Sequence, residues 1–139
     1  MTKHLLADTS VWARSATGAV AERFNEALER GRVAITPVVR LEVLYMARGT
    51  AAFDRLRTSL DALHQVPLDP DVARRAEDVQ SRLARRAMHH RSVGVNDLLI
   101  AAAAEAAGAT VWHYDEDYDR IAAITGQPTE WIVAKGSVP

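Results

Sequence analysis

The sequence alternates short apolar runs with longer segments of helical periodicity, and this alternation restricts the fold more than any other feature. The apolar runs predict five strands, over residues 5–7, 33–35, 66–68, 110–114 and 131–133. Strands separated by helices need crossover connections, which favour a parallel sheet with helices on both faces. We therefore expect an α/β protein with three layers, in which helices flank a central, mostly parallel sheet.

Local signals predict where several helices begin and end. Thr36-Pro37 and Asp69-Pro70 each combine a good N-cap residue with a proline at the first helical position. Gly31 and Gly108 follow two apolar stripes as stop signals. The segment 98–107 is rich in alanine, the strongest helix former.

Composition excludes several kinds of site and location. The 139 residues match one domain, predicted to span 1–139, because domains run to about 100–200 residues. Cysteine is absent, which excludes zinc–thiolate sites, iron–sulfur clusters and disulfides. No apolar run approaches the ~20 residues of a membrane span, and the first residues are too weakly apolar for a signal peptide. We expect a cytoplasmic protein without membrane contact.

Acidic residues stand close to the predicted carboxyl ends of the strands. Asp8 and Asp115 directly follow the first and fourth strands, and Glu42 lies about two turns into the helix after the second. Asp97 falls in the first turn of the alanine-rich helix. Because ligands of parallel sheets bind outside the carboxyl ends of the strands, we expect these four acids to converge.

Convergence of unpaired acids predicts a bound cation. Buried carboxylates are costly unless they are paired or bind a metal, and like charges raise one another's pKa. Oxygen ligands without cysteine favour Mg²⁺ or Mn²⁺ over zinc. Taken singly, Asp8 and Asp97 also have structural interpretations, as helix caps or as partners of a helix dipole. Glu42 has none, because it interrupts an apolar stripe between Leu41 and Val43.

Four segments, in this order, resemble the PIN-domain ribonucleases, and most of all the VapC-type toxins of bacterial toxin–antitoxin pairs. They are residues 6–12 (LADTSVW), 41–44 (LEVL), 96–103 (NDLLIAAA) and 113–122 (HYDEDYDRIA). The resemblance implies a PIN-like fold and an endoribonuclease that cleaves RNA with water activated by one or two Mg²⁺ or Mn²⁺ ions. It also implies the toxin role in a type II pair, a VapB-type antitoxin as partner, and a homodimer.

The matching positions suggest site residues. The resemblance assigns the catalytic and metal-binding acids to Asp8, Glu42 and Asp97, with Asp115 as the fourth and Asp117 as a second candidate for it.

Polar neighbours of these acids follow the family less closely. Thr9 or Ser10 matches a polar position that supports the first acid or its water, and we expect both residues near the substrate. Two positions depart from the family. His113 stands where a hydroxyl residue is frequent, and Tyr118 where phenylalanine is frequent.

The densest basic stretch suggests a grip for RNA. Arg85, Arg86 and Arg91 are predicted to hold the RNA backbone beside the acids, since phosphate contacts position a nucleic acid without reading its sequence. The alternative is a solvated helix end and loop.

Two other functions compete with the nuclease. A degenerate PIN domain could act as a non-catalytic module that binds RNA or protein, although all four acids are retained. A phosphotransfer domain of the haloacid-dehalogenase or receiver type also places an acid after a parallel strand. The dehalogenase pattern needs a second acid where Ser10 stands, and both types need a lysine after a late strand, for which only Lys135 is available.

Overall fold

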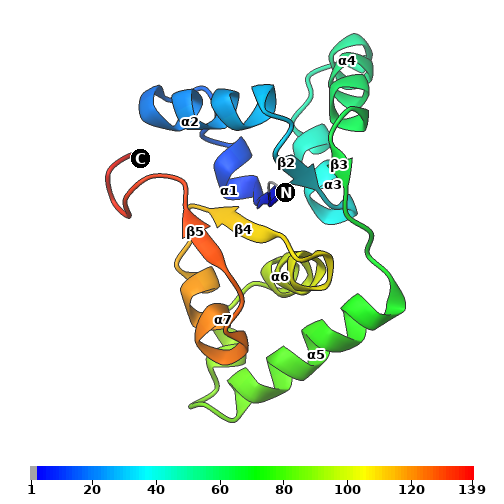
Figure 1. Cartoon of the computed structure of the whole chain (residues 1–139). Coiled ribbons are helices and arrows are strands. Elements are labelled where there is room, and N and C mark those ends of the chain that lie inside the picture. The colour runs from blue at the N-terminus through cyan, green and yellow to red at the C-terminus, as the bar shows by residue number, and fades with distance from the viewer. Residues whose placement is uncertain (1–2) are drawn as a thin grey trace.

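Five strands form one sheet in which every neighbouring pair is parallel (Figure 1). The computed structural model describes residues 3–139 and gives the spatial order β3-β2-β1-β4-β5. The strands are β1 (Leu5–Ala7), β2 (Val33–Ile35), β3 (His64–Gln65), β4 (Thr110–His113) and β5 (Thr129–Trp131). The prediction of an α/β fold with a parallel sheet flanked by helices is confirmed.

The predicted positions of two strands, 66–68 and 131–133, were wrong by two residues. β3 and β5 are edge strands, and both begin earlier, at polar residues. The apolar residues Val66 and Ile132 follow them and are buried, and their amides still donate to Ile35 O and His113 O of the neighbouring strands. At an edge, the apolar run therefore marked the point where the chain enters the core and missed the start of the strand.

Helices cover both faces of the sheet. On one face lie α1 (Thr9–Trp12) and α2 (Gly18–Glu29). The remaining elements lie toward the other face: α3 (Pro37–Tyr45), α4 (Thr50–Asp61), α5 (Pro70–Ala84), the short 3₁₀ helix η1 (His89–Arg91), α6 (Val95–Ala107) and α7 (Asp117–Thr125). Among residues 3–139, no helix is long and apolar enough to be a candidate for crossing a bilayer.

Two hydrophobic clusters meet the sheet from opposite sides because successive side chains of a strand point to opposite faces. Leu6 and Val111 belong to the cluster with α6, whereas Leu5 and Trp112 belong to the cluster with α2. Buried alanines of α6 let its backbone lie close to the sheet, and α5 packs against α6 from outside (Figure 1). Because α6 leads back into β4, its first turn lies toward the carboxyl ends of the strands.

The two predicted proline-containing helix starts differ in their caps. The amide of Val72 donates to Asp69 Oδ1 at 2.9 Å, so Asp69 caps α5 as expected. Thr36 occupies the N-cap position of α3 but makes no capping bond there, and its buried Oγ1 has no partner among the described residues. Proline at the first helical position therefore starts α3 without the side-chain bond.

Replacing Asp69 by alanine should lower the free energy of unfolding by about 1 kcal/mol, because the amide at the start of α5 loses its acceptor. Urea unfolding followed by circular dichroism measures the change. Asp71→Ala is the control, since Asp71 lies in the same first turn, is exposed and does not cap the helix. Equal losses in the two variants would contradict the capping role.

Candidate active site

The carboxyl ends of β1 and β4 form the switch point of the sheet, because the strand order runs outward in opposite directions from this pair. Asp8 leaves β1 here, and its amide donates to Trp112 O at 2.9 Å. Asp115 follows the end of β4 at the same edge. Two of the predicted acids therefore leave adjacent strands at the position where α/β proteins bind ligands.

Asp8 is both a helix cap and a buried acid of this edge. The residue is 4% exposed, and its Oδ2 accepts from the Ser10 amide at 3.0 Å, which caps α1. The Ser10 hydroxyl accepts from the Tyr114 amide at 2.9 Å and so ties α1 to the end of β4. The hydroxyl of Thr9 is buried without a partner among residues 3–139. The cap explains the local turn but supplies no positive charge to balance Asp8.

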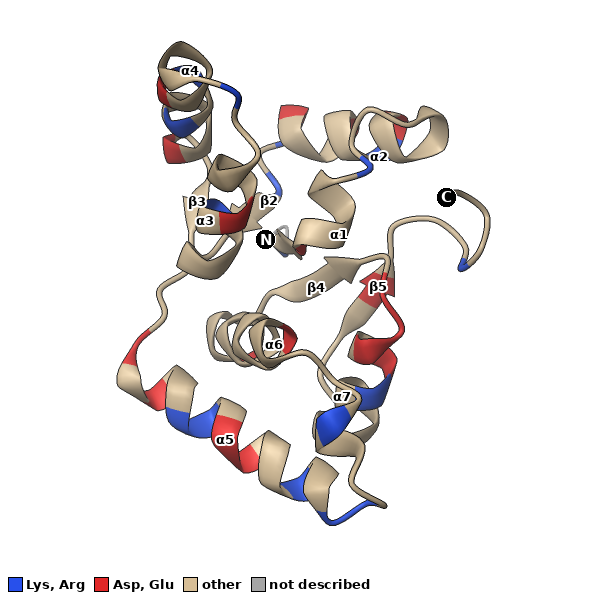
Figure 2. Ribbon diagram, turned by 180° about the vertical axis from the view of Figure 1, so that it is seen from behind, with Lys and Arg blue, Asp and Glu red and all other residues tan. Residues whose placement is uncertain are grey.

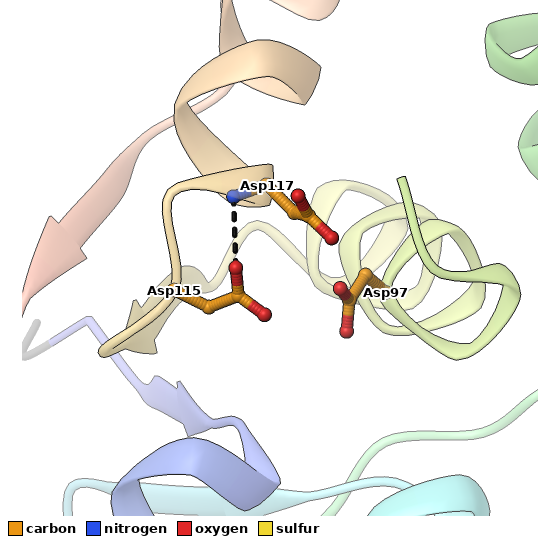
Figure 3. A group of neighbouring side chains, drawn as sticks. All are labelled: Asp97, Asp115 and Asp117. Atoms are coloured by element: carbon orange, nitrogen blue, oxygen red, sulfur yellow. Dashed lines mark hydrogen bonds between the residues drawn. The ribbon is translucent and has the colours of Figure 1, made fainter. Parts of the chain in front are cut away.

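Three carboxylates from separate elements converge at this edge (Figure 3). Asp97 of α6, Asp115 of the loop after β4 and Asp117 of α7 each offer an oxygen, and these oxygens lie within 4.8 Å of one another. The Asp117 amide donates to Asp115 Oδ1 at 3.0 Å, and the Gly94 amide donates to Asp117 Oδ2 at 3.2 Å. Both candidates for the fourth acid, Asp115 and Asp117, therefore lie close to Asp97. The structure brings both of them to the cluster, whereas the sequence had offered them as alternatives.

Gly94 leaves space for the Asp97 carboxylate. A Cβ atom at position 94 would lie 3.1 Å from Asp97 Oδ2, so the carboxylate would have to shift by a few tenths of an ångström. The missing side chain thus leaves room for the Asp97 carboxylate at the start of α6.

Tyr118 joins the buried acid to the cluster. Its side chain is fully buried, and its hydroxyl oxygen lies 2.7 Å from Asp8 Oδ1 and 3.2 Å from Asp97 Oδ1. A phenol has one hydrogen to donate. The shorter contact makes Asp8 its acceptor, and the Tyr118 oxygen can accept from Asp97 when that carboxyl is protonated. The sequence showed Tyr118 only as a departure from the family, and nothing in its spacing indicated this bridge.

Burial and like charge raise the pKa values of the clustered acids. Burial first, and then the neighbouring charge of Asp8, raises the pKa of Asp97 to about 8. Burial also raises the pKa of Asp115, with the charges of Asp117 and Asp8 adding to it. Burial and the charges of Asp8 and Asp97 raise the pKa of the Tyr118 phenol well above its usual value, so it keeps its hydrogen.

His113 positions the backbone beneath the cluster. Its buried Nδ1 accepts from the Asp115 amide at 3.2 Å, and its ring lies against those of Tyr118 and Trp131. Burial lowers the pKa of His113, which keeps the imidazole neutral and able to accept this bond. His113 stands at the position where the family frequently has a hydroxyl residue, and here its imidazole contacts the loop that carries Asp115.

The other predicted residues lie on neighbouring elements. Glu42 is half-buried on α3, which packs against α1 and α6, and its carboxylate has no hydrogen bond or ion pair among residues 3–139. Arg85 is the C-cap of α5, Arg86 follows it and Arg91 ends η1, on the connection that leads into α6. The predicted role of Glu42 as a metal-binding acid stays a prediction. The predicted role of the three arginines in binding RNA also stays a prediction.

The donor set fits a divalent cation. Asp117 has a partner in Arg120, 2.9 Å away, whereas Asp8, Asp97 and Asp115 have no ion-pair partner in the described part of the chain. Figure 2 shows acidic segments gathered where β4 leads into α7, whereas α5 carries both signs along its length. A hard cation with oxygen ligands would neutralise the cluster and favour its ionised form.

Comparison with known proteins identifies the family. The sequence model of the PIN domain matches residues 5–124. The chain belongs to the PIN-domain family. It is 51% identical to Ribonuclease VapC18 of Mycobacterium tuberculosis over 132 residues, which cover 94% of this chain and 96% of that protein. It is 43% identical to Ribonuclease VapC51 of the same organism, covering 98% and 97% of the two chains.

A solved structure supports the same fold. DNA-bound VapBC from Salmonella typhimurium aligns with a TM-score of 0.73 at 23% identity, covering 96% of this chain and 100% of that chain. Membership of the PIN-domain family excludes the phosphotransfer alternative. The dehalogenase type of that alternative also needs an acid where Ser10 stands.

The raised pKa of Asp97 makes metal-free stability depend on pH. From pH 4 to about 8, Asp97 holds a proton in the folded chain that it has lost in the unfolded chain. The stability that this proton contributes is therefore fully present below about pH 4 and is lost as pH rises through about 8. Asp97→Asn should therefore gain stability relative to the parent protein as pH rises from 5.5 to 8.5. Urea unfolding in EDTA tests this, with the exposed Asp54→Asn as control. A difference independent of pH would contradict the assigned shift.

Tyr118→Phe should destabilise the metal-free protein by about 1–3 kcal/mol, because the buried Asp8 carboxylate loses its hydroxyl donor. The measurement is again the free energy of unfolding, in EDTA. Tyr45→Phe removes a hydroxyl from an exposed ring and should change stability by less than about 0.5 kcal/mol. A Tyr118→Phe variant as stable as Tyr45→Phe would show that the bridge carries no energy.

Proposed function

We propose that this PIN-domain protein is an endoribonuclease that depends on Mg²⁺ or Mn²⁺ and acts as the toxin of a VapBC-type pair. One observation carries the proposal: three half-buried carboxylates converge at the switch point of the sheet, and two of them, Asp97 and Asp115, have raised pKa values and no ion-pair partner among residues 3–139. The relatives named ribonucleases supply the substrate class. RNA suits such a site only with a metal ion, since its phosphates would otherwise be repelled by the acids.

The chain's residues divide the task. In this proposal Asp97, Asp115 and Asp117, whose oxygens converge, hold one ion. Asp8, which shares Tyr118 with Asp97, and Glu42, which the resemblance to the family suggests, are the further ligands for that ion or for a second one. When bound, a divalent ion supplies charge neutralisation at the phosphate and activates water near neutral pH. Tyr118 fixes the spacing of Asp8 and Asp97, and His113 holds the loop of Asp115.

The proposed partners follow from the related complexes. Several similar folds are those of VapBC complexes, including VapBC-5 of Mycobacterium tuberculosis at 29% identity and a TM-score of 0.57. We assign a VapB-type antitoxin to this chain on that basis, and a homodimer as the assembly that binds it.

Cleavage of labelled single-stranded RNA tests the activity. The protein should cut RNA with Mg²⁺ or Mn²⁺ and not in EDTA. Asp97→Asn should lower the rate roughly a thousandfold, because an active-site metal contributes several kcal/mol to the transition state. The control is Asp54→Asn, which changes an exposed acid of α4 and should keep the parental rate.

Three outcomes separate the alternatives. Cleavage that persists in EDTA would contradict the metal requirement. Full activity of Asp97→Asn would contradict the assigned site. RNA binding without cleavage under either metal would favour the non-catalytic module.

A further inference from the structure

A hollow of about 660 Å³ opens beside the acid cluster, on the side of α1 and the last residues of the chain. It shares Asp115 with the cluster, and its lining includes Ser10, whose amide donates to Asp8 Oδ2. The other residues that matter are two cations and two aromatic side chains: Arg14, Lys135, Tyr114 and Trp131. Anything bound in this hollow therefore lies next to the proposed site of cleavage.

Arg14 is fixed at one wall of the hollow with a donor left over. Its guanidinium lies over the Tyr114 ring, 4.6 Å from the centroid. Its Nη1 donates to Ser10 O and its Nε to Pro139 O, both at 2.8 Å. Nη2 has no hydrogen-bond partner among residues 3–139. Because the side chain is already held, it can donate to a phosphate with little further loss of conformational freedom.

Lys135 lies on the segment that follows β5, which is tied to the rest of the hollow. The Tyr114 hydroxyl donates to Val138 O at 2.7 Å and accepts from the Val138 amide at 3.2 Å. The ammonium of Lys135 pairs with Glu116 at 2.6 Å, and these side chains are 62% and 49% exposed. Exposed ion pairs are weak, so a phosphate can replace Glu116 as the partner of Lys135.

We propose that this hollow is the RNA-strand subsite of the enzyme, in which Arg14 and Lys135 bind backbone phosphates next to the one that is cut. Tyr114 and Trp131 supply an apolar wall for the adjoining nucleotide, and their rings meet edge to face at 5.5 Å. The inference rests on the proposed ribonuclease function. It proposes a second RNA-binding surface besides the arginines of the α5–α6 connection. It also proposes that Glu116 competes with the RNA phosphate for Lys135.

Substitutions at two residues, Lys135 and Glu116, test the subsite in opposite directions. Lys135→Ala should weaken binding of single-stranded RNA roughly fivefold to tenfold at 50 mM salt and reduce the salt slope by about 0.7, the value for one lost phosphate contact. Lys135→Arg should restore both. Glu116→Gln should tighten binding roughly twofold to fivefold, because it frees Lys135 and removes a negative charge.

Binding is measured by fluorescence anisotropy of labelled RNA with Mg²⁺, in the Asp97→Asn background so that the RNA stays intact. With the otherwise unchanged enzyme, Lys135→Ala should raise KM and leave kcat within about twofold, as expected for a contact that is equal in ground and transition states. The controls are Arg30→Ala and Glu26→Gln, which alter a matched exposed ion pair on α2, 3.1 Å apart, and should change neither quantity.

The outcomes distinguish this inference from the function beneath it. If the unaltered protein neither binds nor cuts RNA, the proposed function fails. If it cuts RNA but Lys135→Ala and Glu116→Gln behave like the α2 controls, the function stands and the subsite is wrong. A loss of affinity in an Arg85→Ala/Arg91→Ala variant, with none in Lys135→Ala, would overturn the subsite in favour of the α5–α6 connection.

Discussion

Repulsion among carboxylates at one edge of a parallel sheet is the constraint around which this structure is arranged. Asp8 is buried at the end of β1, and Asp97 and Asp115 approach it from α6 and from the loop after β4, yet none has an ion-pair partner among residues 3–139. Two effects reduce the repulsion among these acids. The raised pKa keeps Asp97 protonated to about pH 8, and the Tyr118 hydroxyl and the Ser10 amide donate hydrogen bonds to the Asp8 carboxylate. Exchange of protons for a divalent cation is the physical basis of the proposed activity.

The packing of the fold keeps these acids in place. Alanines on α6 bring its axis close to the sheet, so its first turn reaches the carboxyl edge, where Gly94 leaves space for Asp97. The amide of Gly94 also contacts Asp117, which links the starts of α6 and α7. The site is therefore supported by rigid elements, although the loop after β4 supplies one of its carboxylates.

Much of the fold and part of the candidate site could be predicted from the sequence, because they depend on local patterns of residues. The order of elements, the parallel sheet and the placement of Asp8 and Asp115 followed from apolar runs and the rule for strand ends. The edges of the sheet were less predictable, since Thr129 and His64 enter strands through backbone pairing that polar residues also make. The Tyr118 bridge could not be predicted, because a tyrosine in a buried stripe looks the same whether or not its hydroxyl meets an acid 110 residues away. The Lys135–Glu116 pair likewise depends on how the last residues fold back.

The central pairing of β1 with β4 joins residues more than a hundred positions apart. Contacts between such distant segments form only after the later one has been synthesised, whereas helices such as α2 and α5 form from neighbouring residues. A nascent chain that has not yet reached β4 holds Asp8 but lacks the residues that complete the cluster. Synthesis therefore carries a built-in delay: the proposed cutting centre cannot exist until the segment from β4 to Asp117 has been made and paired with β1, long after Asp8 has left the ribosome.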